Sequence, residues 1–223
     1  MSIFSQNSYG KVEYSISLKK INFEKRDTIV SEEKKELANF FKSILKKSIE
    51  RKFELVFNDS ISLFAEKIEL DNKSPESLIG KSSNDKLFIN IKRLEYNNQI
   101  EFYGKMFLIK DKLVLDNWIL NKENSKKILN FNCYKATCLK IINNKSCEIE
   151  AWYTDEIPHS FGPDFYCGLP GIILELKIGD LYYKCESVSF AKVNLKKPNS
   201  GKILSQKEFD VIVNQKQIEI LGF

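Results

Sequence analysis

One short stretch of the chain gathers most of the residue types that could carry out chemistry. His159 is the only histidine, and Asp155, Glu156 and Asp164 lie close to it in the sequence. Carboxylates together with one imidazole can bind a divalent ion, but a solvated loop histidine beside ordinary surface acids explains the same spacing. A single histidine also excludes any site with two imidazole ligands. We therefore expect no metal and no cofactor, and keep a metal site at His159 as the alternative.

A nucleophilic site has equally little support. Cys167 and His159 are the one thiol and imidazole pair that this stretch could bring together. Nucleophilic catalysis also needs a group that orients the imidazole, and no such group can be named. Neither Ser160 nor Cys167 lies in a G-x-S-x-G elbow. We expect a protein that binds rather than catalyses, with a metal- or thiol-dependent enzyme centred on His159 as the alternative.

The segment around these residues has a strong architectural signature. Residues 151–174, AWYTDEIPHSFGPDFYCGLPGIIL, hold three of the five prolines and three of the nine glycines. Pro170 fixes its backbone φ, while Gly168 and Gly171 permit positive φ and close backbone approach. These glycines precede a strand rather than a helix, which disfavours a phosphate-binding loop. The residues assigned to the structural motif are Gly162, Pro163, Gly168, Leu169 and Gly171. The residues predicted to contact a ligand are Trp152, Tyr153, His159, Phe161, Phe165 and Pro170.

The same segment carries a family resemblance. The run GLPGIIL, preceded by AWYTDEIP and a Gly-Pro pair, resembles the signature of the GLPGLI family, with Ile172 in place of the second Leu. Cys133 begins a stretch similar to that family's CxKA segment. The family is found mainly in Bacteroidetes and has no established activity, so the resemblance implies kinship and no reaction. Its members usually carry a signal peptide, which implies a periplasmic or secreted location in the cell envelope.

The N-terminus and the length set the expected domain organisation. Met1–Gln6, MSIFSQ, look like the tail of a signal peptide, with a flexible N-terminus as the alternative. We assign residues 1–9 to this segment and residues 10–223 to a single GLPGLI-like β domain. No apolar run approaches the roughly 18 residues of a membrane-spanning helix, so no transmembrane segment is expected.

Charge and cysteine content indicate which partners and which cross-links to expect. The net charge is +5, but only three of the 35 basic residues are arginines, and 30 acids are interleaved with them. Nucleic-acid binding favours arginine forks on a basic stripe, so we expect no nucleic acid and instead an unknown apolar ligand or an envelope protein. In an oxidising envelope the five cysteines could form at most two disulfides, with buried thiols as the alternative. The candidates are Cys133, Cys138, Cys147, Cys167 and Cys185.

Hydrophobic periodicity predicts a mainly β protein of the α+β class. Residues 10–18 alternate as a half-buried strand, and strand patterns, including residues 112–120, follow from Phe53 onward. Between them, Ser31 is a natural N-cap for a long amphipathic helix beginning at Glu32, with apolar residues at helical spacing. Residues 205–214 favour a short helix over a strand, and residues 217–220 alternate as a brief terminal strand.

Two hairpins can be registered residue by residue. A turn at Asn143 and Asn144 pairs Tyr134 with Tyr153 and Ala136 with Ala151. A turn at Gly179 and Asp180 gives the second hairpin. It places Ile172, Leu174, Leu176 and Ile178 on the same face as Leu181, Tyr183 and Cys185, with Glu175 across from Lys184 on the other face.

The elements together predict a wide antiparallel sheet of about nine to eleven strands, strongly curved or closed into a partial barrel. The long helix is expected on its concave side. We expect a non-catalytic binding or accessory protein that holds an apolar ligand or peptide on this concave sheet.

Overall fold

The computed structural model describes residues 9–18, 51–67, 84–142, 145–193 and 195–221. The helix predicted from Glu32 lies outside the described residues, as does the turn predicted at Asn143 and Asn144. In the described part of the chain, no helix is long and apolar enough to cross a membrane.

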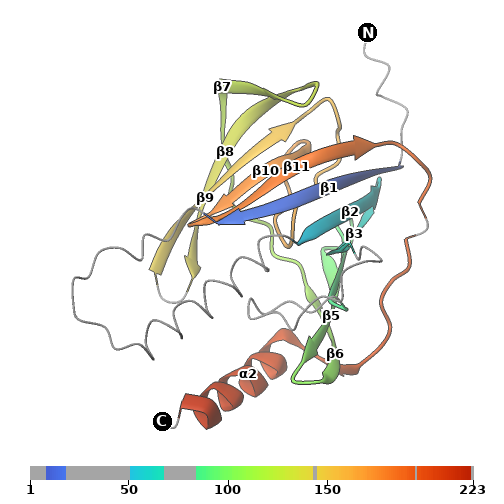
Figure 1. The fold of residues 1–223 in the computed structure, drawn as a ribbon, viewed down its shortest axis with the longest axis vertical. Coiled ribbons are helices and arrows are strands. Elements are labelled where there is room, and N and C mark those ends of the chain that lie inside the picture. Colours follow the sequence, from blue (N-terminus) through green and yellow to red (C-terminus); the bar gives the residue numbers. More distant parts are fainter. Residues whose placement is uncertain (1–8, 19–50, 68–83, 143–144, 194, 222–223) are drawn as a thin grey trace, which may run out of the picture.

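The described residues build one open sheet of twelve strands (Figure 1). Its order is β12-β6-β5-β4-β3-β2-β1-β11-β10-β9-β8-β7, so β12 and β7 form its two edges. Every neighbouring pair is antiparallel except β12 and β6, which are parallel, and the sheet is therefore mixed. The strands are β1 (Tyr9–Leu18), β2 (Lys52–Asn58), β3 (Ile61–Glu66), β4 (Lys86–Asn90), β5 (Glu95–Phe102), β6 (Lys105–Lys112), β7 (Ile119–Ile128), β8 (Phe131–Ile142), β9 (Lys145–Thr154), β10 (Ile172–Ile178), β11 (Leu181–Ser189) and β12 (Lys202–Leu204).

The mainly β class and the wide sheet are confirmed. The purely antiparallel arrangement of nine to eleven strands is wrong, because the sheet has twelve strands and β12 runs parallel to β6. The sheet is also open rather than closed into a partial barrel. The strand predicted over residues 112–120 is also wrong. The β6 strand ends at Lys112, residues 113–118 form no strand, and β7 begins at Ile119. The mostly polar sequence of β7 has no alternating apolar face, which is why the sequence pattern missed it.

The core lies on the concave face of the sheet. Phe53 and Phe64 stack with ring centroids 5.3 Å apart, and Tyr183 meets both rings edge-on. Tyr14 and Leu55 are fully or almost fully buried in the same cluster. Alternating apolar side chains on successive strands therefore supply one continuous apolar layer.

Both predicted hairpin registers are confirmed over most of their length. Tyr134 pairs with Tyr153 and Ala136 with Ala151 in the β8–β9 hairpin. In the β10–β11 hairpin, Ile178 pairs with Leu181 and Glu175 with Lys184.

The regular alternation predicted at the start of β10 is wrong. Ile173 pairs with Tyr153, and Glu175 pairs with the adjacent Trp152, so Leu174 is the extra residue of a β-bulge. The bulge changes which side chains at the start of β10 lie on the same face as Tyr153. Ile173 lies on that face, where regular alternation had placed Ile172 and Leu174. Leu174 is fully buried all the same.

The predicted short C-terminal helix is confirmed but is longer, and it forms α2 (Gln206–Leu221), the single helix among the described residues. Ser205 and Glu208 make a reciprocal capping box: the Ser205 amide donates to Glu208 Oε2 at 2.7 Å, and the Glu208 amide donates to Ser205 Oγ at 3.3 Å. Phe209 packs against Phe102 and Phe107. The terminal strand predicted over residues 217–220 is wrong, because the helix continues through them.

Candidate functional site

The segment with the predicted motif, residues 155–171, joins β9 to β10, and we call it the β9–β10 connection. Its Phe165 meets Tyr96 of β5 edge-on, with ring centroids 5.0 Å apart. The adjacent Tyr166 lies under Lys140 of β8, whose Nζ is 4.4 Å from the ring centroid. Because β5 and β8 are distant in the strand order, the sheet must curve around this connection. The connection therefore occupies the concave side at one end of the sheet.

Backbone hydrogen bonds hold the connection in place. The amide of Gly168 donates to the carbonyl of Ser160 at 3.0 Å, so the two arms of the connection are tied together. The amide of Ile173 donates to the carbonyl of Phe161 at 2.9 Å, which attaches one arm to β10. From the sheet, the Tyr14 hydroxyl donates to the carbonyl of Ile173 at 2.6 Å. These bonds satisfy backbone groups that burial removes from water.

Backbone geometry explains why two positions of the motif are glycine. A Cβ on Gly171 would lie 1.9 Å from the carbonyl oxygen of Thr154, so only glycine fits at this crossing of backbone on backbone. Gly168 has φ +92°, in the left-handed region that other residues rarely adopt. Leu169, between these glycines, is almost fully buried, and Pro170 is exposed. The GLPG run thus delivers the chain into β10 while its leucine anchors the core.

His159 lies in an apolar environment within the connection. The residue is 92% buried, and its ring packs on Phe57 with ring centroids 4.8 Å apart. Phe161 adjoins the same phenylalanine. The exposed carboxylate of Asp59 lies 4.0 Å from Nδ1. The structure therefore places His159 and Phe161 in the core beneath β2.

The acids near His159 in sequence point to other partners. Asp155 lies 3.6 Å from Lys122 Nζ, and Glu156 Oε1 accepts from the Asn132 amide at 2.8 Å. The described residues contain no cluster of three His, Cys, Asp or Glu side chains that could hold a metal ion. The sequence proximity of these acids is thus not a spatial cluster around the imidazole.

The predicted ligand contacts Trp152 and Tyr153 lie on opposite faces of the sheet. Tyr153 is fully buried on the concave face, and its hydroxyl is the one buried side-chain polar atom in the described structure without a hydrogen-bond partner. Trp152 is partly exposed on the outer face. Successive residues of a strand must alternate in this way, so the two aromatic residues cannot belong to one site.

Around Trp152 the outer face carries charged residues that sequence reasoning missed. Lys126 of β7 lies over the indole, with Nζ 4.3 Å from the ring centroid, and forms an ion pair with the largely buried Glu175. The indole Nε1 donates to Glu150 at 3.0 Å, and Lys135 pairs with that same carboxylate at 2.7 Å. Glu175 lies opposite Lys184 in the backbone register, as predicted, but its ion-pair partner comes from the distant strand β7.

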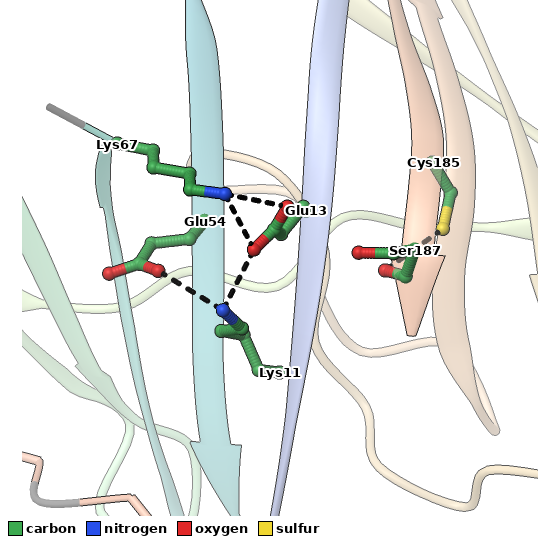
Figure 2. A network of polar contacts seen from close by, with 6 residues as sticks. All are labelled: Lys11, Glu13, Glu54, Lys67, Cys185 and Ser187. Carbon is green, nitrogen blue, oxygen red and sulfur yellow. Dashed lines mark hydrogen bonds and ion pairs between the residues drawn. The ribbon is translucent and has the colours of Figure 1, made fainter. Parts of the chain in front are cut away.

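The outer face of β1 and β2 continues this ionic character (Figure 2). Glu13 accepts from Lys11 at 2.7 Å and from Lys67 at 2.9 Å, and Glu54 lies 3.9 Å from Lys11. The hydrogen bond from Lys11, followed by that from Lys67, lowers the pKa of Glu13 below its ordinary value. A mixed-sign, paired surface of this kind is typical of a solvated sheet face.

All five predicted disulfide candidates are free thiols, so the disulfide prediction is wrong for this structure. Cys138 lies opposite Ile149, and Cys147 lies opposite Lys140, which makes the two cysteines diagonal neighbours. Diagonal Cα atoms are typically about 7 to 8 Å apart, beyond the usual span of a disulfide. Burial raises the pKa of Cys167 to about 12, so its thiol is protonated at neutral pH.

The end of the concave face away from the β9–β10 connection is more open. Ile16, Ile178 and Leu181 are partly exposed there, and Ile178 and Leu181 are direct neighbours across the β10–β11 hairpin. Ile16 lies opposite Tyr183, two residues from Leu181 on β11. Cys147, also partly exposed, lies close to the β10–β11 turn at Gly179. These apolar side chains form a continuous patch that we call the open rim.

A family described as a protein of unknown function (Porph_ging) matches residues 140–175, a stretch that contains the whole motif segment 151–174. Two solved structures of PNGF-II, in the C2 and P21 space groups, have the same fold over 92% of this chain, each with a TM-score of 0.60. Their sequences are 16% and 15% identical to it, so the likeness concerns the fold alone. The chain spans about one third of PNGF-II, covering 32% and 33% of those chains. No curated protein matches the sequence.

Proposed function

We propose that the chain is a non-catalytic binding or accessory protein of the cell envelope that holds an apolar ligand or peptide on the concave face of its sheet. The observation that carries the proposal is the open rim, where Ile16, Ile178 and Leu181 leave apolar surface partly exposed beside a continuous core. Contiguous exposed apolar surface of this kind is typical of a ligand or partner site. The envelope location rests on the resemblance to the GLPGLI family.

The position of the β9–β10 connection restricts where the ligand lies. His159 and Phe161 fill the opposite end of the concavity and pack on Phe57. They therefore support the ligand site as core residues, while the ligand contacts belong to the open rim. Phe165, which is partly exposed, and the exposed Pro170 are the members of the predicted set that stay accessible from the connection.

The alternative of an enzyme centred on His159 finds less support in the geometry. Its imidazole packs on an aromatic ring in the core, and the Cys167 thiol is 99% buried with its pKa raised to about 12. A nucleophilic cysteine instead needs a lowered pKa and access to its substrate.

Native mass spectrometry of the protein purified from its own envelope tests the proposal. We expect a copurified apolar molecule or peptide, and we expect Leu181→Gln at the open rim to reduce its occupancy about tenfold. Val114→Gln is the matched control, because Val114 is 84% exposed and lies away from the rim. Equal occupancy in both variants would contradict a ligand at the rim. If His159→Ala abolished the activity of the protein while its fold stayed intact, the alternative of an enzyme centred on His159 would be favoured.

A further inference from the structure

A row of apolar side chains crosses four strands of the concave face. Leu181 of β11 lies opposite Ile178 of β10, and Ile178 lies opposite Ile149 of β9. Ile149 in turn lies opposite Cys138 of β8. Directly opposite residues share a face of the sheet, so the four side chains line up across the strands, and we call them the apolar row. Leu181 and Ile178 are partly exposed at the open rim, whereas Ile149 and Cys138 are buried.

An ion pair lies at the buried end of the apolar row. Lys140 is two residues from Cys138 on β8 and lies opposite Cys147 of the open rim. Alternate residues of a strand share a face, so Lys140 projects from the concave face together with Cys138. Its Nζ is 2.8 Å from Asp116 Oδ1 and 4.4 Å from the ring centroid of Tyr166. We call Lys140, Asp116 and Tyr166 the clasp.

The clasp is anchored to the closed end of the concavity. Asp116 belongs to residues 113–118, the segment that joins β6 to β7. In the same segment, the indole Nε1 of Trp118 donates to the carbonyl of Cys167 at 3.0 Å. The rings of Trp118 and Tyr166 lie 6.4 Å apart. The clasp therefore joins β8, this segment and the β9–β10 connection, and these contacts hold it in place.

The charges of the clasp oppose an apolar ligand that reaches this far. The side chain of Lys140 is 31% exposed and that of Asp116 is 11% exposed. Burial is the main reason that the pKa of Cys138 is raised to about 11, but Asp116 also raises it and Lys140 lowers it, so both charges act on the end of the apolar row. An apolar chain that covered the ion pair would remove it from water, which costs free energy. A chain that stops at the open rim avoids this cost.

We propose that the open rim binds a linear apolar chain that lies across β11, β10 and β9, and that the clasp limits the length of the chain. The chain contacts Leu181 and Ile178 and ends at Cys147, where Lys140 begins the charged boundary. Two strand spacings separate β11 from β9, so the accepted chain is about 10 Å long, close to the length of octanol. The inference deepens the proposed function and rests on it, because it requires a ligand at the open rim.

Straight-chain alkanols from butanol to dodecanol test the length limit by displacing the neutral fluorescent dye N-phenyl-1-naphthylamine. For the unsubstituted protein we expect affinity to rise by at most about fourfold per methylene as far as octanol, and to change within about twofold beyond it. Lys140→Met replaces the charge by an apolar side chain of similar length. Affinity should then continue to rise, with dodecanol at least about tenfold tighter than octanol. Lys140→Met/Asp116→Asn should behave in the same way, and it leaves neither charge without its partner.

Lys135→Met is the matched control. Lys135 also lies on β8 and pairs with Glu150 at 2.7 Å, but on the outer face opposite Trp152, so this variant should keep the limit at octanol. The inference would be overturned if the unsubstituted protein showed no length limit, or if folded Lys140→Met and the double variant kept the limit unchanged. Alkanol binding that Leu181→Gln weakens would in that case leave the proposed function standing. If neither dye nor alkanol binding responded to Leu181→Gln, both the inference and the ligand site at the open rim would be overturned.

Discussion

The two faces of strands β8 to β10 differ in how they are stabilised, although the same backbone carries both. On the concave face, Tyr153 and Ile173 are fully buried beneath the β9–β10 connection. On the outer face, the adjacent Trp152 and Glu175 meet Lys126 in an ionic cluster. The concave face depends on close fit and backbone hydrogen bonds, and the outer face depends on paired charges at the solvent boundary.

This difference assigns a role to the GLPG segment. Its glycines allow backbone to cross backbone, and its leucine is buried, so the motif closes one end of the concavity. The other end keeps the partly exposed open rim. The segment that resembles a family signature thus has a clear architectural role in this fold, and the surface that we propose for a ligand is the open rim.

We expect the largest effect from a substitution on the concave face. Leu174→Asp places a carboxylate at a fully buried position of the β10 bulge. An unpaired buried charge costs several kcal/mol, about the whole stability of a domain, so we expect an unfolded or insoluble protein in circular dichroism. Leu139→Asp is the matched change on the outer face, where Leu139 is 74% exposed, and it should leave the melting temperature nearly unchanged. A soluble Leu174→Asp with a normal melting temperature would reject the buried bulge.

The next effect tests the backbone crossing. A Cβ at Gly171 would lie 1.9 Å from the Thr154 oxygen, so Gly171→Ala must displace the connection or the end of β9. We expect a loss of about 3 kcal/mol in urea unfolding. Gly104→Ala is the control, because a Cβ at Gly104 would have nothing within 4 Å. Gly104 has φ +68°, so we expect this change to cost about 1 kcal/mol through backbone strain alone. Equal losses would show that close approach is not what requires glycine at position 171.

Local patterns predicted the hairpins correctly because alternation and turn residues act between neighbouring strands. The pairing of Tyr134 with Tyr153 and of Glu175 with Lys184 follows from a few residues on either side of a turn. The opposite faces of Trp152 and Tyr153 follow from the same alternation, so the sequence contained the information to separate them.

Features that depend on distant segments were not predictable in this way. Three consecutive apolar residues, Ile172 to Leu174, conceal a bulge, because a strand buried on both faces shows no alternation to count. The partner of Glu175 is Lys126 on β7, a polar strand that the pattern missed. The placement of His159 against Phe57 likewise depends on how the β9–β10 connection folds back, which its sequence spacing does not encode.

A smaller effect sharpens the account of the outer face. Hydrogen bonds from Lys11 and Lys67 lower the pKa of Glu13 in the folded protein, so the folded state binds fewer protons than the unfolded state in acid. The stabilisation is therefore complete above the ordinary pKa of 4.5 and is lost as pH falls through the lowered value. We expect Glu13→Gln to cost about 0.5 to 1 kcal/mol at pH 7 and less at pH 3, in unfolding measured across pH. Glu123→Gln, on the exposed face of β7, is the control, and an equal cost at both pH values would contradict the ion-pair account.

The smallest effect distinguishes the closed end of the concave face from the open rim, and it is measured as a labelling rate. Burial raises the pKa of Cys133, Cys167 and Cys185 to about 12 and that of Cys138 to about 11, whereas Cys147 is partly exposed near the rim. Because iodoacetamide reacts with accessible thiolate, we expect one fast modification of the native protein, at Cys147, in time-resolved mass spectrometry. Cys147→Ser should remove the fast phase, and unfolding without reductant should expose all five thiols of the unsubstituted chain. Fast labelling of Cys167 would show that the β9–β10 connection opens readily, and a deficit of thiols after unfolding would show that a disulfide forms after all.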